Sequence, residues 1–135
     1  MAKTKVPNFL CEELSYKIRG CVFEVYNTLG FGHKENIYQK ALMAEFEKAG
    51  INFEREKALP ITYNNKKIGF YRPDFIIENK IIIEIKAVEF MPKDYETQLT
   101  YYLKGTNYQL GFLINFGGKK IDIRRRVWSP CYRHR

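Results

Sequence analysis

The first third of the chain carries apolar residues at helical spacing. One stripe, at intervals of three, four and seven residues, consists of Leu14, Ile18, Cys21, Val22, Val25 and Leu29. This spacing predicts a helix from about Cys11 to Leu29, which Gly30 ends as a C′ glycine. A second stripe consists of Tyr38, Ala41, Leu42, Glu45, Phe46 and Ala49. It predicts a second helix from about Lys34 to Ala49, with Gly50 following.

From Ile51 onward the pattern changes to that of strands. Alternating apolar residues at 59–63 and 67–71, separated by the turn residues Asn64-Asn65, predict a β-hairpin. Pro73 interrupts the alternation, and a short strand is expected at 75–77. The apolar run from Ile81 to Val88 then predicts a strand in the middle of a sheet.

A third helix and two more strands complete the predicted order. The helix is predicted by an apolar face made of Tyr95, Leu99, Tyr102 and Leu103. It is expected to start after Pro92 and to end at Gly105. Further strands are expected at about 108–115 and 121–128. With the hairpin taken as one element, the order is two helices, three strands, a helix and two strands. A crossover helix permits parallel pairing and hairpins require antiparallel pairing, so the sequence predicts an α/β fold with a mixed β-sheet flanked by helices.

Two charged residues interrupt the most apolar strand. Residues two apart in a strand point the same way, so Glu84 and Lys86 share a face with Ile82, while residues 81, 83 and 85 face the other side. Burying an ion costs several kcal/mol unless it is paired or binds a metal. Asp74 follows Pro73 at a bend ten residues before Glu84. Antiparallel pairing of the two strands would bring these carboxylates together.

Such a pair of carboxylates is suited to a hard divalent cation. Asp74, Glu84 and the backbone carbonyl of Ile85 would supply oxygen ligands of the kind that magnesium prefers. Lys86 would then lie beside the metal, where it can orient a water molecule or stabilise negative charge in a transition state. The alternative from these residues alone is an ordinary Glu–Lys pair on a solvated strand face.

Two other features are compatible with a site at this end of the sheet. Gln98 and Tyr102 are four residues apart on the third predicted helix, so they project from one face and are placed to meet a phosphate or the lysine; the alternative is that Tyr102 belongs to the core. The turn from Gly30 to Tyr38 contains two glycines and brings Glu35 to the start of the second helix. By itself Glu35 is interpreted as a capping residue.

Length and composition limit the classes of protein. A chain of 135 residues with 45% apolar residues predicts one globular domain over 1–135, with a basic C-terminal tail at about 129–135. No apolar run approaches the roughly 20 residues that cross a bilayer. The three cysteines form no CxxC pair and predict reduced thiols in the cytoplasm.

The net charge of +8 is concentrated near the C-terminus. From Lys119 to Arg135 there are seven basic residues and one acidic residue, so the remaining 118 residues carry only +2. Phosphate contacts supply affinity for nucleic acid, and the interleaved Trp128 and Tyr132 offer faces for unpaired bases. The basic side chains expected to bind nucleic acid are Arg124, Arg126, Arg133 and Arg135. The alternative is a solvated tail without a binding role.

Taken together, these residues resemble the PD-(D/E)XK nuclease superfamily, and within it a small bacterial group with the pattern Gly-x-x-Glu-x-x-Tyr. That pattern is present as Gly32, Glu35 and Tyr38. The superfamily motif is present as Pro73-Asp74 followed by Glu84-Ile85-Lys86, and the Gln-x-x-x-Tyr extension of RecB-type exonucleases as Gln98 to Tyr102. The resemblance runs from about Ser15 to Trp128 and implies a restriction-endonuclease-like αβββαβ core.

The resemblance also implies roles for individual residues. Asp74 and Glu84 would bind magnesium or manganese, with Glu35 as an additional ligand, and Lys86 would be the catalytic lysine. Gln98 and Tyr102 would position DNA. The expected activity is therefore metal-dependent hydrolysis of phosphodiester bonds in DNA, in repair, recombination or defence. Two alternatives remain open: a non-catalytic nucleic-acid-binding module on the same fold, and an interaction subunit of a larger defence assembly.

Overall fold

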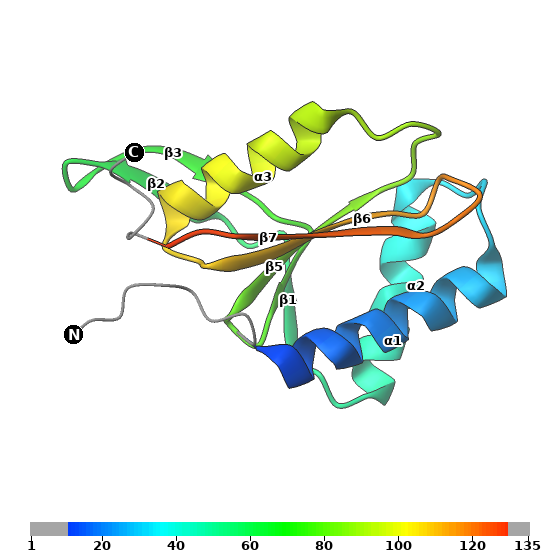
Figure 1. Ribbon diagram of the computed structural model, residues 1–135. Coiled ribbons are helices and arrows are strands. Elements are labelled where there is room, and N and C mark those ends of the chain that lie inside the picture. The colour runs from blue at the N-terminus through cyan, green and yellow to red at the C-terminus, as the bar shows by residue number, and fades with distance from the viewer. Residues whose placement is uncertain (1–10, 130–135) are drawn as a thin grey trace.

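Three helices form close to their predicted positions. In the computed structural model, which describes residues 11–129, they are α1 (Glu12–Leu29), α2 (Glu35–Lys48) and α3 (Lys93–Thr106) (Figure 1). Gly105 was expected to end the third helix, but it lies inside α3. The left-handed residue that ends α3 is Asn107, with φ 69°. Asparagine tolerates this conformation because its short polar side chain can hydrogen-bond locally.

The central sheet has five strands in the order β1-β4-β5-β6-β7. Their bounds are Phe53–Arg55 (β1), Phe75–Ile77 (β4), Ile81–Lys86 (β5), Leu110–Asn115 (β6) and Asp122–Val127 (β7). The pair β5–β6 is parallel, since α3 connects these strands, and the other pairs are antiparallel. The predicted mixed sheet flanked by helices is thus confirmed.

The expectation of three strands before the third helix is too low. Five strands precede α3, since the hairpin contributes two of them and the three-residue β1 carries no alternation to reveal it. The predicted hairpin is present as β2 (Leu59–Tyr63) and β3 (Lys66–Tyr71), but it forms a separate two-stranded sheet. It packs its inward residues Leu59, Ile61 and Tyr71 on the α3 side of the central sheet. The hairpin therefore belongs to the layer of α3.

The molecule has three layers. Figure 1 shows α1 and α2 on one face of the central sheet and α3 with the hairpin on the other. Alternation along β5 serves both faces: Ile81, Ile83 and Ile85 pack with α1 and α2, whereas Ile82 packs with α3. Glu84 and Lys86 therefore face the layer of α3 and the hairpin, as their spacing predicted.

Candidate active site

Asp74 and Glu84 lie side by side at the end of two central strands. The antiparallel register pairs Phe75 with Ile83, so the next step brings Asp74 opposite Glu84. Asp74 Oδ2 also accepts a hydrogen bond of 2.6 Å from the backbone N–H of Ile85. The predicted approach of the two carboxyl groups is therefore observed, and the strand that carries Glu84 also fixes the orientation of Asp74.

The environment of these carboxyl groups favours protonation or a bound cation. Burial, then repulsion from Asp74, raises the pKa of Glu84 to about 8, against the opposing effects of Tyr71 and Lys86. Burial also raises the pKa of Asp74, although the hydrogen bond from Ile85 and the charge of Lys86 oppose the shift. Ionising two closely spaced carboxyl groups costs free energy, because the like charges repel each other unless a positive charge compensates them. This donor set of hard oxygens fits a divalent cation such as magnesium.

Lys86 occupies the same face as Glu84, two residues further along β5. Its Nζ atom lies 4.5 Å from the centroid of the Tyr95 ring, on the first turns of α3. A cation over an aromatic face is attracted by the ring quadrupole, so Tyr95 fixes where the ammonium group is held. The same amine lowers the pKa of Glu84, Asp74 and Glu35. Lys86 is thus electrostatically coupled to all three acidic residues of the predicted site.

Tyr71 joins the site although the sequence pattern did not single it out. Its hydroxyl donates a hydrogen bond to Glu84 Oε2, and its ring stacks on Tyr102 with centroids 3.6 Å apart. Burial first, and then the Glu84 charge, raise the pKa of Tyr71, so the phenol keeps its proton and remains a donor. The available signal was an aromatic hydroxyl in the strand immediately before Pro73-Asp74. The sequence does not show that the Tyr71 side chain points toward Glu84, because this orientation depends on how the hairpin folds over α3.

The two residues of the Gln-x-x-x-Tyr pattern take different positions. Tyr102 is partly buried against Tyr71, which connects it to Glu84 through one side chain. Gln98 is exposed on α3, one turn after Tyr95. The core alternative for Tyr102 is therefore correct in part, since its ring packs with the apolar residues under α3. Gln98 remains available to a bound molecule.

The turn before α2 brings Glu35 toward the carboxyl pair. Gly30 and Gly32 adopt φ values of 68° and 107°, which other residues rarely adopt. The buried Tyr38 holds this turn, because its hydroxyl donates to the Gly30 carbonyl at 2.6 Å and accepts from the His33 N–H at 3.2 Å. Burial, then repulsion from Asp74, raises the pKa of Glu35. Glu35 therefore interacts electrostatically with Asp74, while Tyr38 has a structural role.

Glu35 does not complete a ready-made cluster. Among residues 11–129, no three side chains of His, Cys, Asp or Glu lie close enough together to hold a metal ion. The close pair is Asp74 and Glu84, with the Ile85 carbonyl as the further oxygen that the sequence suggested. The role of Glu35 as a ligand stays a prediction.

A clamp fixes the chain just beyond Lys86. The buried Asn115, at the end of β6, accepts a hydrogen bond from the Val88 N–H at 3.0 Å and donates one to the Val88 carbonyl at 2.9 Å. A Cβ atom at Gly117 would lie 2.3 Å from Val88 N, so only glycine allows this close approach. Neither residue was singled out in the sequence. Together they hold the end of β5, from which Lys86 projects.

The predicted basic strip is partly neutralised. Arg124 pairs with Asp122 at 2.7 Å and with Glu96 of α3, and Arg126 also pairs with Glu96. These arginines therefore tie β7 to α3, which the sequence did not indicate, although both side chains remain partly exposed. Arg133 and Arg135 lie outside the described residues. A nucleic-acid contact by any of the four stays a prediction.

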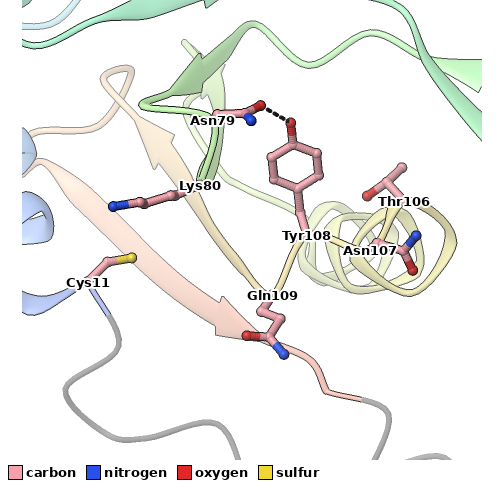
Figure 2. A pocket seen from close by; sticks show the side chains of 7 residues that line it. All are labelled: Cys11, Asn79, Lys80, Thr106, Asn107, Tyr108 and Gln109. Carbon is pink, nitrogen blue, oxygen red and sulfur yellow. Dashed lines mark hydrogen bonds between the residues drawn. The ribbon is translucent and has the colours of Figure 1, made fainter.

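A separate hollow of the described surface lies away from the carboxyl pair. It lies at the amino ends of β5 and β6 and has a volume of about 610 Å³. Figure 2 shows the side chains that line it: Cys11, Asn79, Lys80, Thr106, Asn107, Tyr108 and Gln109. Tyr108 donates a hydrogen bond of 3.0 Å to Asn79 across it. The carboxyl pair lies at the opposite, carboxyl end of β5. This pocket contains no carboxylate and belongs to a different end of the sheet.

Comparison with known proteins agrees with this geometry. A family model described as the PD-(D/E)XK nuclease superfamily matches residues 12–127. The chain therefore belongs to the PD-(D/E)XK nuclease superfamily, as its motifs suggested; the Gly-x-x-Glu-x-x-Tyr subgroup stays a prediction. No curated protein sequence matches the chain.

Two solved structures are similar in fold. The crystal structure of SSO0001 matches with a TM-score of 0.53 and 16% identity, over 85% of this chain and 77% of that chain. An alkaline exonuclease (LHK-Exo) from Laribacter hongkongensis matches with a TM-score of 0.46 and 12% identity, over 84% of this chain and 81% of that chain. At 16% identity the likeness to the first of these structures concerns the fold alone. No helix within residues 11–129 is long and apolar enough to cross a membrane.

Proposed function

We propose that this protein is a metal-dependent nuclease that hydrolyses phosphodiester bonds in DNA. The observation that carries the proposal is the contact between Asp74 and Glu84, with Lys86 on the same face of β5. Two partly buried carboxyl groups with raised pKa values and an adjacent ammonium group have no structural need to converge. Perturbed groups gathered in this way are typical of a catalytic site.

Asp74, Glu84 and the Ile85 carbonyl would hold a magnesium or manganese ion, with Glu35 as an additional ligand. When bound, such an ion polarises the phosphate and lowers the pKa of a bound water molecule. Tyr71 keeps Glu84 oriented through its hydrogen bond, and the Ile85 N–H does the same for Asp74. Lys86, held over the Tyr95 ring, would stabilise the negative charge that develops on the phosphate.

The DNA would lie over α3 and the carboxyl end of β5. Gln98 is exposed there and can donate to a phosphate oxygen, while Tyr102 supports the side chain of Tyr71. Arg124, Arg126, Arg133 and Arg135 would add phosphate contacts, the first two in competition with Glu96. We place the protein in the cytoplasm, where Cys11 and Cys21, both free thiols in the structure, would stay reduced.

Cleavage assays test this function directly. Purified protein is incubated with labelled linear and circular DNA in the presence of magnesium, manganese or a chelator, beside the Lys86→Ala variant. Lys104→Ala is a matched control, because Lys104 also lies over a tyrosine ring, Tyr101, but away from the carboxyl pair. We expect products only with metal, from the wild type and the control. DNA binding without cleavage under every condition would favour the non-catalytic module.

A further inference from the structure

The outer face of the β2–β3 hairpin exposes apolar side chains to solvent. Pro60 and Phe70 are paired across the two strands and point away from α3, since their neighbours Leu59 and Tyr71 are buried against it. Phe70 is 62% exposed and Ile68 is 65% exposed. Exposed apolar side chains gathered on one strand face commonly mark a binding surface.

The hairpin and the residue that follows it carry only positive charges. Residues 59–72 contain Lys66, Lys67 and Arg72 and no acidic residue. All three side chains are exposed, and none forms a salt bridge with another residue between 11 and 129. The lysines lie at the turn end of the hairpin, where a bulge between Ile61 and Thr62 shifts the register, and Arg72 lies at the other end. In contrast, Arg124 and Arg126 are committed to acidic partners.

We propose that this hairpin face binds an unpaired strand of DNA, with Phe70 stacked on a base and the three cations on neighbouring phosphates. The inference rests on the proposed function and extends it to a substrate class, DNA with single-stranded character. Aromatic faces stack on bases of any sequence, and a cationic surface follows the phosphate backbone. Phe70 is exposed enough to accept a base without rearrangement of the core.

The hairpin is close enough to the carboxyl pair to serve the same strand. β3 ends at Tyr71, three residues before Asp74, and the four residue steps from Phe70 to Asp74 span at most about 14 Å. Tyr71, the next residue after Phe70, donates a hydrogen bond to Glu84. A strand held by the hairpin would therefore lie only a few nucleotides from the scissile phosphate. Figure 1 shows the hairpin beside α3, the helix that carries Gln98.

A second copy of this chain is a poorer occupant for the same face. Two identical faces meeting across a two-fold axis would bring three uncompensated cations of each copy together. Like charges directly opposite each other destabilise paired strands. A polyanion removes this repulsion, whereas a second copy creates it.

Binding to a labelled thymidine oligonucleotide of about 20 nucleotides tests the inference. The measurement uses the full chain in a chelator, so that binding is separated from cleavage. Phe70→Ala should weaken binding about tenfold, because stacking on one base is lost. Phe70→Trp should restore it, whereas Phe70→Leu, which stays apolar but cannot stack, should not. Melting temperatures of all variants establish that each is folded.

Phe23→Ala is the matched control. Phe23 is an exposed phenylalanine on α1, on the opposite face of the central sheet, and is 43% exposed. The chemical change is the same as at Phe70, so this variant should bind the oligonucleotide like the wild type. Equal weakening by both substitutions, or none by Phe70→Ala, would overturn the inference.

The salt dependence of binding tests the cations. Lys66→Gln combined with Lys67→Gln should flatten the plot of log affinity against log salt by about 1.4, because each contact to a single strand contributes about 0.7. Lys17→Gln with Lys40→Gln removes the same charge from exposed positions on α1 and α2 and should leave the slope unchanged. An unchanged slope in the hairpin variant would mean that these lysines make no phosphate contacts.

The outcomes separate this inference from the proposed function. Weaker binding by Phe70→Ala in a protein that never cleaves would support the hairpin site and reject the nuclease. Cleavage by the wild type with unchanged binding by Phe70→Ala would support the nuclease and reject the hairpin site. A wild type that does not bind the oligonucleotide, or a Phe70→Ala variant that only loses self-association in sedimentation, would show that the face serves another partner.

Discussion

Tyr71 and Tyr102 stack face to face, with ring centroids 3.6 Å apart and planes inclined by 12°. Tyr71 comes from the hairpin and Tyr102 from α3, so the stack joins these two elements above the sheet. Because the hydroxyl of Tyr71 donates to Glu84, the stack also sets the position of a carboxyl group on β5. An aromatic pair in the core thus helps to position Glu84, a residue of the proposed active site.

Tyr71→Phe should therefore raise the magnesium concentration needed for half-maximal cleavage by about tenfold to a hundredfold, as loss of a partner to a metal ligand does. The stack is retained, so stability should change little. Tyr108→Phe is the control, because it removes a tyrosine hydroxyl that donates to Asn79 at the far end of the sheet. An unaltered magnesium requirement would mean that the Tyr71 hydroxyl does not orient Glu84.

Lys86→Ala should lower the cleavage rate by about a hundredfold to a thousandfold, because it removes a fixed positive charge at the phosphate. DNA binding and melting temperature should stay close to those of the wild type. Glu84→Gln should be at least as severe, but a higher metal concentration should rescue it in part, which is not expected for Lys86→Ala. Comparable cleavage by folded Lys86→Ala and by Lys104→Ala would remove Lys86 from the mechanism.

The stability of the metal-free protein should depend on Glu84. Burial and Asp74 raise the pKa of this carboxyl from 4.5 to about 8, so the folded protein holds the proton more tightly than the unfolded chain. The contribution of this protonated carboxyl group to the free energy of unfolding is fully present below about pH 4.5 and is lost as the pH rises through about 8. Glu84→Gln cannot ionise and is spared this loss.

In a chelator, the melting temperature of Glu84→Gln minus that of the wild type should therefore increase as the pH rises from about 5 to about 9. Added magnesium should remove the difference at high pH by stabilising the ionised wild type. Glu47→Gln, which changes an exposed carboxylate on α2, serves as the control. A constant difference across this range would contradict the raised pKa of Glu84.

Gly117→Ala should destabilise the protein by about 1–3 kcal/mol, the range typical of overpacking. A Cβ atom there would lie 2.3–2.6 Å from backbone atoms of Val88 and Ala87, which cannot give way as a flexible side chain would. Gly20→Ala is the matched control on α1, where no atom lies within 4 Å of an added Cβ and alanine favours the helix. Urea unfolding measures both. Equal stability of the two variants would show that the segment after Lys86 is free to move.

Most of the fold and the centre of the site could be predicted because their signals are local. The isoleucines of β5 give its burial, and a ten-residue separation with a turn places Asp74 opposite Glu84. The contacts that were missed depend on how distant elements cross. Tyr71 meets Glu84 only because the hairpin folds onto α3, and Glu96 meets Arg124 and Arg126 only because α3 crosses β7. Spacing along one strand contains no information about such crossings.

The two outer strands of the central sheet have a further consequence, for self-association through sheet edges. An edge strand offers unpaired backbone groups to any other strand, and long flat edges promote aggregation. Here one edge, β1, is only three residues long, and the other, β7, carries three consecutive arginines from Arg124 to Arg126. A foreign strand that paired with β7 would have to accommodate these bulky cations. The arginines that join β7 to α3 therefore also protect the chain from adding strands at its edge during folding.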